Sequence, residues 1–405
     1  MPPAKPDPVD DVESDENEES QDENELNANN VTKYQAAAEI ANKALQKVIA
    51  GAVDGALVLD LCALGDKTIE EGAKGVYNKG KVKVAKGIAF PTCVSPNNAI
   101  CHLSPLPSEP EAKLALKTGD VVRIELGAHV DGYIAQVAHT LVVGASKEKP
   151  ITGRQADVLQ AAYTAIEAAI RLLRPGKTNT SITDTVQKIA ESYNCKPVEG
   201  MLSHQLKRNV LDGSKQIILN PSDAQKKEVE TQTFEEGEVY SLDILISSGE
   251  GKAKPLETRT TIYKRNAEAS YQLKMKTSRA VFTEITQKCG TMAFGLRQLD
   301  DEKKAKMGII ECSNHGLVTP YGVLYEKEDA HIAHFMFTVL LMPNGPLKIT
   351  SFPWDQETVK SELEVKDEEV KELLKQSVKI NSKKANKKKK KKAGAEAKDE
   401  AADEE

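Results

Sequence analysis

Apolar residues recur at helical spacing in two segments of the chain. In residues 155–173 they fall three or four apart on one face, and the sequence RPGK directly after them ends the pattern. Residues 181–193 repeat this spacing behind Thr180, which can act as a helix cap. The apolar positions are Leu159, Ala162, Ile166, Ala169 and Leu173 in the first segment and Ile182, Val186, Ile189 and Tyr193 in the second. These segments and residues 268–289 are predicted to be helices.

Runs rich in β-branched residues separate the helical segments and predict strands. They are VVRIELGAHV at 121–130, IAQVAHTLVV at 134–143, VYSLDILIS at 239–247, TRTTIY at 258–263 and FMFTVLLM at 335–342. Two segments echo each other, because GDVVRIE and GEVYSLD both place a carboxylate six residues after a glycine. The pattern predicts an α+β body built from two pseudo-related halves.

Composition divides the chain of 405 residues into four parts. We expect a disordered acidic arm at 1–30 and a folded domain at 31–355. Residues 356–380 should form a helical extension, and residues 381–405 a disordered tail that is first lysine-rich and then acidic.

The formal net charge of −6 conceals opposite charges at the two ends of the chain. Residues 1–30 carry eleven acidic residues and one lysine, whereas residues 379–392 carry nine lysines and no acidic residue. No segment approaches the ~20 apolar residues of a membrane-spanning helix, and the first thirty residues lack the pattern of a signal peptide. The six cysteines never occur as CxxC, which argues against a zinc knuckle or a disulfide framework. We therefore expect a soluble intracellular protein with no membrane partner.

A candidate site lies on the strand pair around the sequence HVDGY. A tight turn there should bring Glu125 and Gln136, eleven residues apart, opposite each other on an antiparallel pair. At these positions the chain resembles the methionine aminopeptidase family, whose strands carry an aspartate at each. The resemblance extends over nearly the whole body, through the segments NNAICHLSP, EGMLSHQLKRNVLDGSK, FEEGEVYSLDILIS and AHFMFTVLLMP.

The resemblance implies a pita-bread fold with a degenerate active site. In that family five ligands hold two divalent cations, and the two bridging carboxylates correspond to Gln136 and Met336. An amide and a thioether are poor ligands for hard divalent cations, and only Glu125 and Asp243 remain of the four family carboxylates. We therefore expect no bound metal, no other cofactor and no peptidase activity.

The remaining site positions also follow from the resemblance. His102 matches the histidine that contacts substrate and His204 the metal-binding histidine, whereas Asp212 stands where the family has a second substrate-contacting histidine. From the residues alone, His102 and His204 would more often be hydrogen-bonded pocket histidines, and Met336 would be a core residue.

A closer resemblance is to the proliferation-associated nucleolar proteins, a non-peptidase branch that includes an ErbB-receptor-binding protein and a fungal curved-DNA-binding protein. It is carried by GIAFPTCVSPNNAICHLSPL, VEGMLSHQLK and the lysine-run ending. This resemblance implies binding to the large ribosomal subunit, its precursors, rRNA and other structured RNA. It also implies roles in ribosome biogenesis, translation and growth regulation, contacts with growth-signalling proteins, and a location in the nucleus, nucleolus and cytoplasm.

The lysine run is the candidate nucleic-acid contact outside the body. Lysine blocks bind phosphates without reading sequence, so binding should weaken steeply with salt. The run comprises Lys383, Lys384, Lys387, Lys388, Lys389, Lys390, Lys391 and Lys392. Three alternatives remain: the run is only an import signal or a solvated end, the protein is a DNA-binding transcriptional regulator, or it is a mononuclear aminopeptidase that uses His204, Glu125 and Asp243.

Overall fold

The computed structural model describes residues 23–79 and 83–379. Helix α2 (Ala28–Gly51) begins three residues before the expected start of order at Val31, because the side chain of Asn27 accepts a hydrogen bond from the backbone N–H of Asn30. Most of the expected acidic arm, the lysine run and the acidic end lie outside the described residues.

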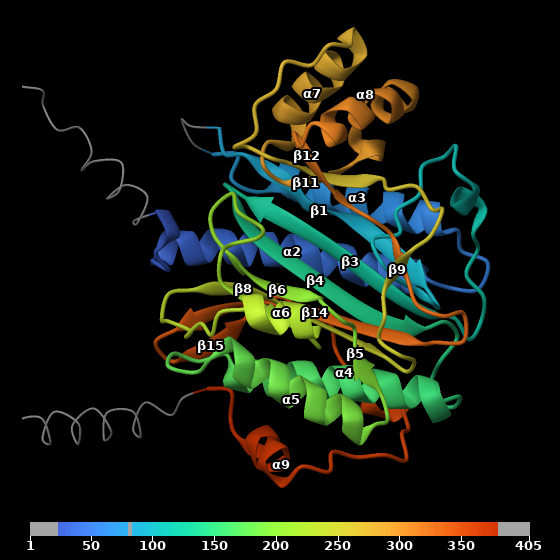
Figure 1. Cartoon of the computed structure of the whole chain (residues 1–405), viewed down its shortest axis with the longest axis vertical. Coiled ribbons are helices and arrows are strands. Elements are labelled where there is room, and N and C mark those ends of the chain that lie inside the picture. The colour runs from blue at the N-terminus through green and yellow to red at the C-terminus, as the bar shows by residue number, and fades with distance from the viewer. Residues whose placement is uncertain (1–22, 80–82, 380–405) are drawn as a thin grey trace, which may run out of the picture.

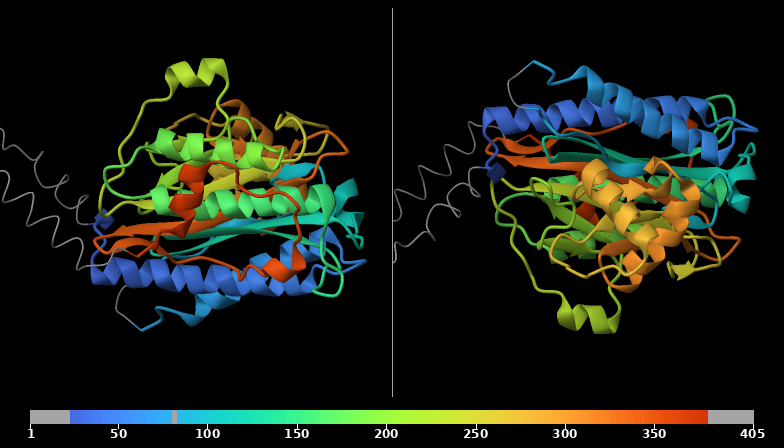
Figure 2. Two further views of the ribbon diagram at one scale, coloured as in Figure 1. Left: turned by 90° about the horizontal axis from the view of Figure 1, so that it is seen from below. Right: turned by 90° about the horizontal axis from the view of Figure 1, so that it is seen from above.

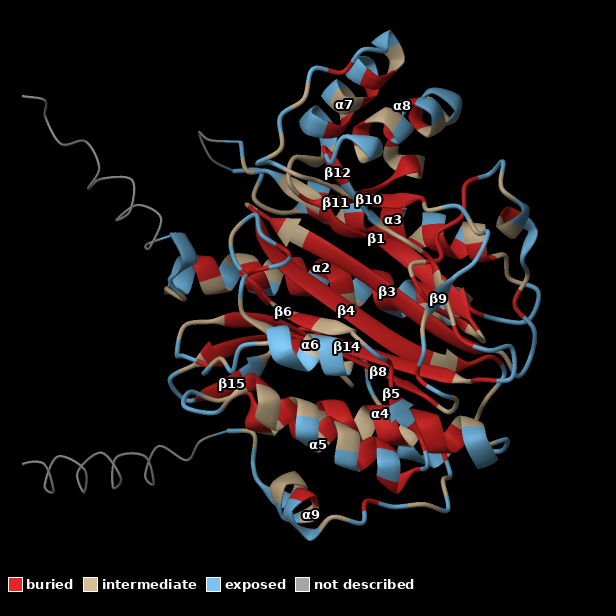
Figure 3. Ribbon diagram, in the orientation of Figure 1, coloured by how far each residue is buried: buried red, intermediate tan, exposed pale blue. Residues whose placement is uncertain are grey.

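A large antiparallel sheet forms the centre of the molecule (Figure 1). In the described part of the chain it has nine strands, seven of them in the order β1-β3-β4-β14-β8-β6-β7, with β15 beside β14 and β5 beside β8. Their bounds are β1 (Lys86–Pro96), β3 (Val121–Val130), β4 (Tyr133–Val142), β5 (Lys196–Pro197), β6 (Leu202–Leu206), β7 (Gln216–Ile218), β8 (Val239–Ser247), β14 (Ile332–Met342) and β15 (Gly345–Lys348). The strands at the centre are almost wholly buried (Figure 3).

Each half of the sheet is covered by its own pair of helices. Helices α2 and α3 (Val58–Gly75) pack on β1, β3 and β4, whereas α4 (Gly153–Leu172) packs on β8 and β14 and α5 (Asn179–Ser192) on β7. Figure 2 shows these layers from two further sides. The two halves therefore repeat one arrangement, helix pair followed by antiparallel strands, as the sequence echo predicts.

A smaller helical unit stands beside this body. It contains α7 (Lys276–Cys289) and α8 (Glu302–Asn314) on a three-stranded sheet of β10 (Ile262–Arg265), β11 (Ala293–Gly295) and β12 (Val318–Tyr321), joined by the 3-10 turn η2 (Leu296–Gln298). The buried pair Arg297–Asp66, 2.6 Å apart, ties it to α3. A second small sheet contains β2 (Ala99–Cys101), β9 (Lys254–Pro255) and β13 (Leu324–Tyr325).

The remaining elements are short. They are α6 (Asp223–Glu228), α9 (Glu368–Lys375) and the 3-10 turns η1 (Pro110–Lys113) and η3 (Gln356–Thr358). No helix in the described ranges is long and apolar enough to cross a lipid bilayer.

Two of the predicted elements are shorter than expected. The helix predicted at 268–289 begins only at Lys276, because the Glu311 carboxylate accepts the backbone N–H groups of Lys274 and Met275 at 2.7 and 3.2 Å and holds them outside the helix. The strand predicted at 258–263 occupies Ile262–Arg265 instead, the stretch that pairs with both β11 and β12.

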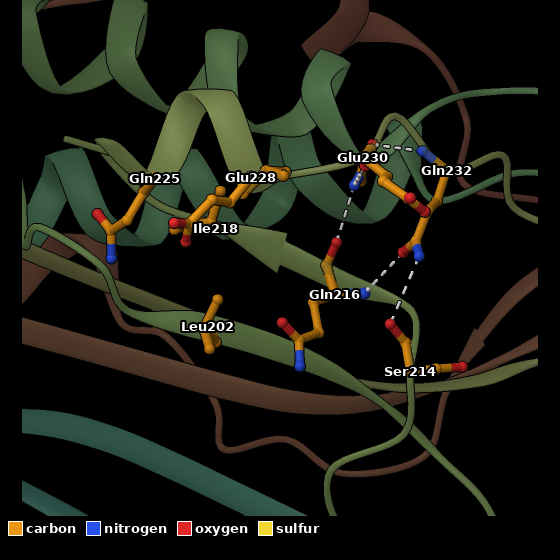
Figure 4. A pocket seen from close by; sticks show the side chains of 10 residues that line it. Leu202, Ser214, Gln216, Ile218, Gln225, Glu228, Glu230 and Gln232 are labelled. Carbon is orange, nitrogen blue, oxygen red and sulfur yellow. Dashed lines mark hydrogen bonds between the residues drawn. The ribbon is translucent and has the colours of Figure 1, made fainter. Parts of the chain in front are cut away.

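The outer edge of β7 is closed by side chains. The backbone N–H of Gln216 donates to Oε1 of Gln232 at 3.1 Å (Figure 4). The Gln216 carbonyl accepts from Nδ2 of Asn179 at 3.0 Å. The hydroxyl of Thr183 donates to the carbonyl of Ile218 at 2.7 Å. Side chains thus take the place that a further strand would occupy.

Candidate functional site

The seven side chains singled out from the sequence converge on one cavity of about 230 Å³. They come from strands and loops of both halves of the sheet: His102, Glu125, Gln136, His204, Asp212, Asp243 and Met336. Phe90, Leu211, Ser241 and Tyr321 complete much of its wall. The structure therefore brings together residues that are up to 234 positions apart in the sequence.

Strand register determines how these side chains face the cavity. Glu125 is the fifth residue of β3 and Asp243 the fifth of β8, so the two halves place their carboxylates equivalently. Met336 of β14 lies directly opposite Asp243. Residues at alternate positions of a strand share a face, which directs these groups into one space.

The expected direct pairing of Glu125 with Gln136 is wrong. The two-residue turn at Asp131 and Gly132 pairs Val130 with Tyr133, so Glu125 lies opposite Ala138 and Gln136 lies opposite Gly127. A Cβ atom on Gly127 would come within 2.9 Å of Cγ of Gln136. The missing side chain at Gly127 leaves the space that Gln136 occupies.

His334 is a component of the site that the sequence interpretation missed. Its Nε2 lies 2.6 Å from Oδ1 of Asp243, and its side chain is buried. Burial alone would lower the pKa of His334, but the carboxyl groups of Asp243 and Glu125 together outweigh burial and raise it. The sequence could have indicated His334, because it lies two residues before Met336 and therefore shares its face of the strand.

Glu125 has no such partner. Burial raises the pKa of its carboxyl from 4.5 to about 7, and the nearby His334 lowers it only in part. Near neutral pH this side chain is therefore a mixture of acid and carboxylate. The cavity therefore carries less negative charge than it would if Glu125 were exposed to water.

The two predicted histidines are neutral pocket residues at pH 7. Burial lowers the pKa of His102 to about 4, and its Nδ1 lies 3.1 Å from the carbonyl oxygen of Gly322. The rings of Phe90 and Tyr321 lie against it, with centroids 5.8 and 5.5 Å away. Burial also lowers the pKa of His204, whose Nδ1 is buried without a hydrogen-bond partner among the described residues.

Asp212 lines the cavity but is engaged by a lysine. Its carboxylate forms an ion pair with Lys264 at the start of the small helical unit. An aspartate carboxylate only accepts hydrogen bonds, so it cannot donate one as the imidazole of a histidine would at this position.

The residues of this cavity do not fit a pair of divalent cations. Gln136 and Met336 supply an amide and a thioether, which are poor ligands for hard divalent cations, and Asp243 is already engaged by His334. Within the described ranges, no three histidine, cysteine, aspartate or glutamate side chains are grouped so that they could hold a metal ion. The predicted nucleic-acid contacts, Lys383 to Lys392, lie outside the described residues.

Comparisons with known proteins agree on one family. The model of metallopeptidase family M24 matches residues 32–273. ERBB-3 binding protein 1 of Solanum tuberosum is 49% identical over 341 residues, which are 83% of this chain and 86% of that protein. The curved DNA-binding protein of Schizosaccharomyces pombe is 47% identical over 356 residues, 87% of this chain and 92% of that protein.

Solved structures show the same fold. The structure of a thermophilic Arx1 superposes with a TM-score of 0.82 at 33% identity and covers 87% of this chain and 100% of its own. A methionine aminopeptidase from Thermotoga maritima has a TM-score of 0.53 at 17% identity, over 80% of this chain and 98% of its own. The architecture is therefore the pita-bread fold of methionine aminopeptidases.

Proposed function

Because this chain belongs to metallopeptidase family M24, in its branch of ERBB-3-binding and curved-DNA-binding proteins, we propose that it is a non-peptidase that binds ribosomes. The proposed loss of peptidase activity is supported by the side chains that line the cavity. Gln136 and Met336 stand where the family resemblance places the two carboxylates that bridge the metal ions. His334 is hydrogen-bonded to Asp243. A hydroxide held between two metal ions has no ligand set here.

The binding function rests on the family resemblance and on the lysine run. The partners are the large ribosomal subunit and its precursors, rRNA and other structured RNA, together with proteins of growth signalling. The protein would act in ribosome biogenesis, translation and growth regulation, in the nucleus, the nucleolus and the cytoplasm. The lysine run supplies phosphate contacts that do not depend on base sequence.

Loss of peptidase activity is tested by metal analysis and a peptide assay. After incubation with manganese or cobalt and desalting, the purified protein should retain far less than two ions per chain and should release no methionine from a Met-peptide. Two retained ions together with turnover would contradict the proposal. An active methionine aminopeptidase carried through the same steps is the control.

Ribosome binding is tested by sedimentation of tagged full-length protein with purified subunits. We expect the protein to sediment with the large subunit and to return to the unbound fractions when RNase digests the exposed rRNA. Sedimentation with neither subunit at low salt would refute the binding proposal and leave the degenerate cavity unexplained by it.

A second candidate partner is DNA, which the name of the fission-yeast relative favours. Lysine contacts to phosphates do not distinguish the two sugars, so the choice needs a direct competition. Labelled duplex RNA and duplex DNA of equal length should be compared at one salt concentration. Tighter binding of the DNA duplex would favour this second candidate.

A further inference from the structure

The acidic arm enters the folded body at the end of the β3–β4 hairpin. The Tyr133 hydroxyl donates to the Glu23 carbonyl at 2.8 Å, and the Arg208 backbone N–H donates to Oδ1 of Asn24 at 2.9 Å. The Arg208 guanidinium also pairs with the Glu23 carboxylate and, at 2.9 Å, with Asp131 in the hairpin turn. An acidic side chain of the arm thus already binds a basic residue of the body.

Three further lysines lie around this point and lack acidic partners. We call Lys83, Lys86 and Lys207 together the basic surface. The Lys86 ammonium donates only to neutral oxygen atoms, the Val76 carbonyl and Oδ1 of Asn78. No carboxylate in the part of the chain that the structure describes pairs with Lys83, Lys86 or Lys207.

A cavity of about 450 Å³ opens between Lys83 and Lys86 on one side and the small helical unit on the other. Lys83, Lys86, His129, Asn209 and Lys288 are among the residues that line it. Lys288 is already neutralised by Glu284 and Asp300, at 2.8 and 2.7 Å. The uncompensated positive charge is therefore on the hairpin side, toward Arg208.

The cavity and the entry point of the arm share a wall. Asn209, which lines the cavity, follows directly after Arg208 and donates its backbone N–H to the Gly132 carbonyl at 2.9 Å. The backbone N–H of Asp131 donates to the Ala85 carbonyl, between Lys83 and Lys86, at 2.6 Å. The start of α2, the hairpin turn and the entry to β1 lie on one side of the molecule in both Figures 1 and 2.

We propose that the acidic residues of segment 1–22 bind the basic surface in the same molecule and compete there with outside anions. The segment carries nine acidic residues and one lysine, opposite in sign to the surface. Lys207 directly precedes Arg208, which already binds Glu23, and an extended chain adds roughly 3.3–3.6 Å of reach for each residue before Glu23.

The acidic arm is covalently attached to the body, which favours it over a separate acidic partner as the occupant of the basic surface. Exposed ion pairs each contribute little to binding, so a separate acidic peptide would bind weakly. A short tether raises the local concentration to the order of millimolar, and several pairs can then form together. This inference goes beyond the proposed function and needs no ribosome to be tested.

The test measures how fast single lysines react with an amine acylating reagent. The full-length protein is compared with a variant in which the nine acidic residues of 1–22 are changed to Asn or Gln. At low salt Lys83, Lys86 and Lys207 should react several-fold more slowly in the unaltered protein. In 0.5 M NaCl the difference should disappear, since the Debye length falls to about 4 Å.

Matched control lysines lie at the opposite end of the same hairpin. Lys113, Lys117 and Lys149 are exposed and precede β3 or follow β4, about ten strand residues, or roughly 34 Å, from the turn. Their reaction rates should be equal in the two proteins. A general effect of the substitutions on folding or charge would slow or speed both sets alike.

Two results would overturn the inference. If Lys83, Lys86 and Lys207 react equally fast in both proteins at low salt, the arm does not cover them. If only added duplex RNA slows them, the basic surface belongs to a nucleic acid and the arm has no part in it. Neither result depends on whether the protein sediments with ribosomes, so the two proposals fail separately.

Discussion

Glu125 and Asp243 occupy the same place in their strands but have different neighbours. Asp243 is paired with His334 at 2.6 Å, whereas Glu125 has no partner within hydrogen-bond distance among the described residues. A buried carboxylate without a partner is costly, and a paired one is tolerated. Of these two groups, Asp243 is thus held by a histidine, whereas Glu125 is an unpartnered carboxyl that is part acid and part carboxylate near neutral pH.

The first prediction concerns Glu125→Gln. The pKa of Glu125 is raised to about 7 in the folded state from 4.5, so the unfolded chain releases this proton first as pH rises. The free energy of unfolding therefore falls as pH rises from 4.5 through 7. Above this range the loss amounts to about 3 kcal/mol. Gln carries no such proton, so the variant should match the unaltered protein at pH 4 and exceed its stability at pH 8.

Urea unfolding at the two pH values measures this difference. Glu71→Gln, on an exposed position of α3, is the matched control and should change stability by the same small amount at both. An equal effect of Glu125→Gln at pH 4 and pH 8 would show that the carboxyl is not desolvated.

The second prediction concerns His334→Ala. The substitution leaves the Asp243 carboxylate in the cavity without its partner, and breaking such a pair costs about 3–5 kcal/mol. Adding Asp243→Ala should recover part of that loss, because the unpaired charge is removed with it. A double-mutant cycle in urea gives the coupling energy, and strictly additive losses would mean that the two side chains do not interact.

At the scale of elements, pairing and packing explain what the sequence could and could not predict. Apolar spacing was enough to predict α4 and α5, and runs rich in β-branched residues were enough to predict β3, β4, β8 and β14, which are buried at nearly every position. The equivalence of Glu125 and Asp243 was visible in two glycine-led strand segments.

The sequence did not show the details that depend on contacts between side chains far apart along the chain. The register of β3 and β4 follows from a two-residue turn at Asp131 and Gly132. This turn places Gln136 opposite Gly127 and not opposite Glu125. The late start of α7 depends on Glu311, far along the chain in α8. His334 was missed because its role appears only when β14 is placed beside β8, where its ring meets Asp243.

The third prediction restores the family ligands on three strands. Glu125→Asp, Gln136→Asp and Met336→Glu together return the lost bridging carboxylates, but His334 still holds Asp243. We therefore expect weak binding of manganese in the triple variant and clearly tighter binding when His334→Gln is added. Calorimetric titration compares the two, with the single variant His334→Gln as control. A flat titration for both would mean that the strands do not present the carboxylates to one ion.

For the whole molecule, charge rather than shape distinguishes the two ends from the body. The first thirty residues hold eleven acidic residues, and residues 379–392 hold nine lysines. Segregated charges of this size act on any polyanion that approaches the protein, and salt screens them.

The fourth prediction is the effect of deleting Lys383 to Lys392. Each lost phosphate contact removes about 0.7–0.9 from the slope of log K against log salt, so the slope should fall by several units. Subunit binding should weaken without disappearing, since contacts made by the folded body remain.

The measurement is subunit binding of both proteins over a salt series. Deletion of the acidic end, 393–405, is the matched control and should leave the slope within one unit. Loss of all binding at low salt would make the tail the whole binding site. An unchanged slope would reduce the lysine run to an import signal or a solvated end.

The closed edge of β7 has a consequence for the behaviour of the protein at high concentration. An exposed strand edge is a template on which another chain can add a strand, and long-lived aggregates grow from such additions. Here Asn179, Thr183 and Gln232 already satisfy three backbone groups of that edge, so a second molecule would have to break these bonds before it could join. Three uncharged side chains on neighbouring segments thus protect this side of the sheet from fibril-like growth, a safeguard for a protein that would work among crowded ribosomes.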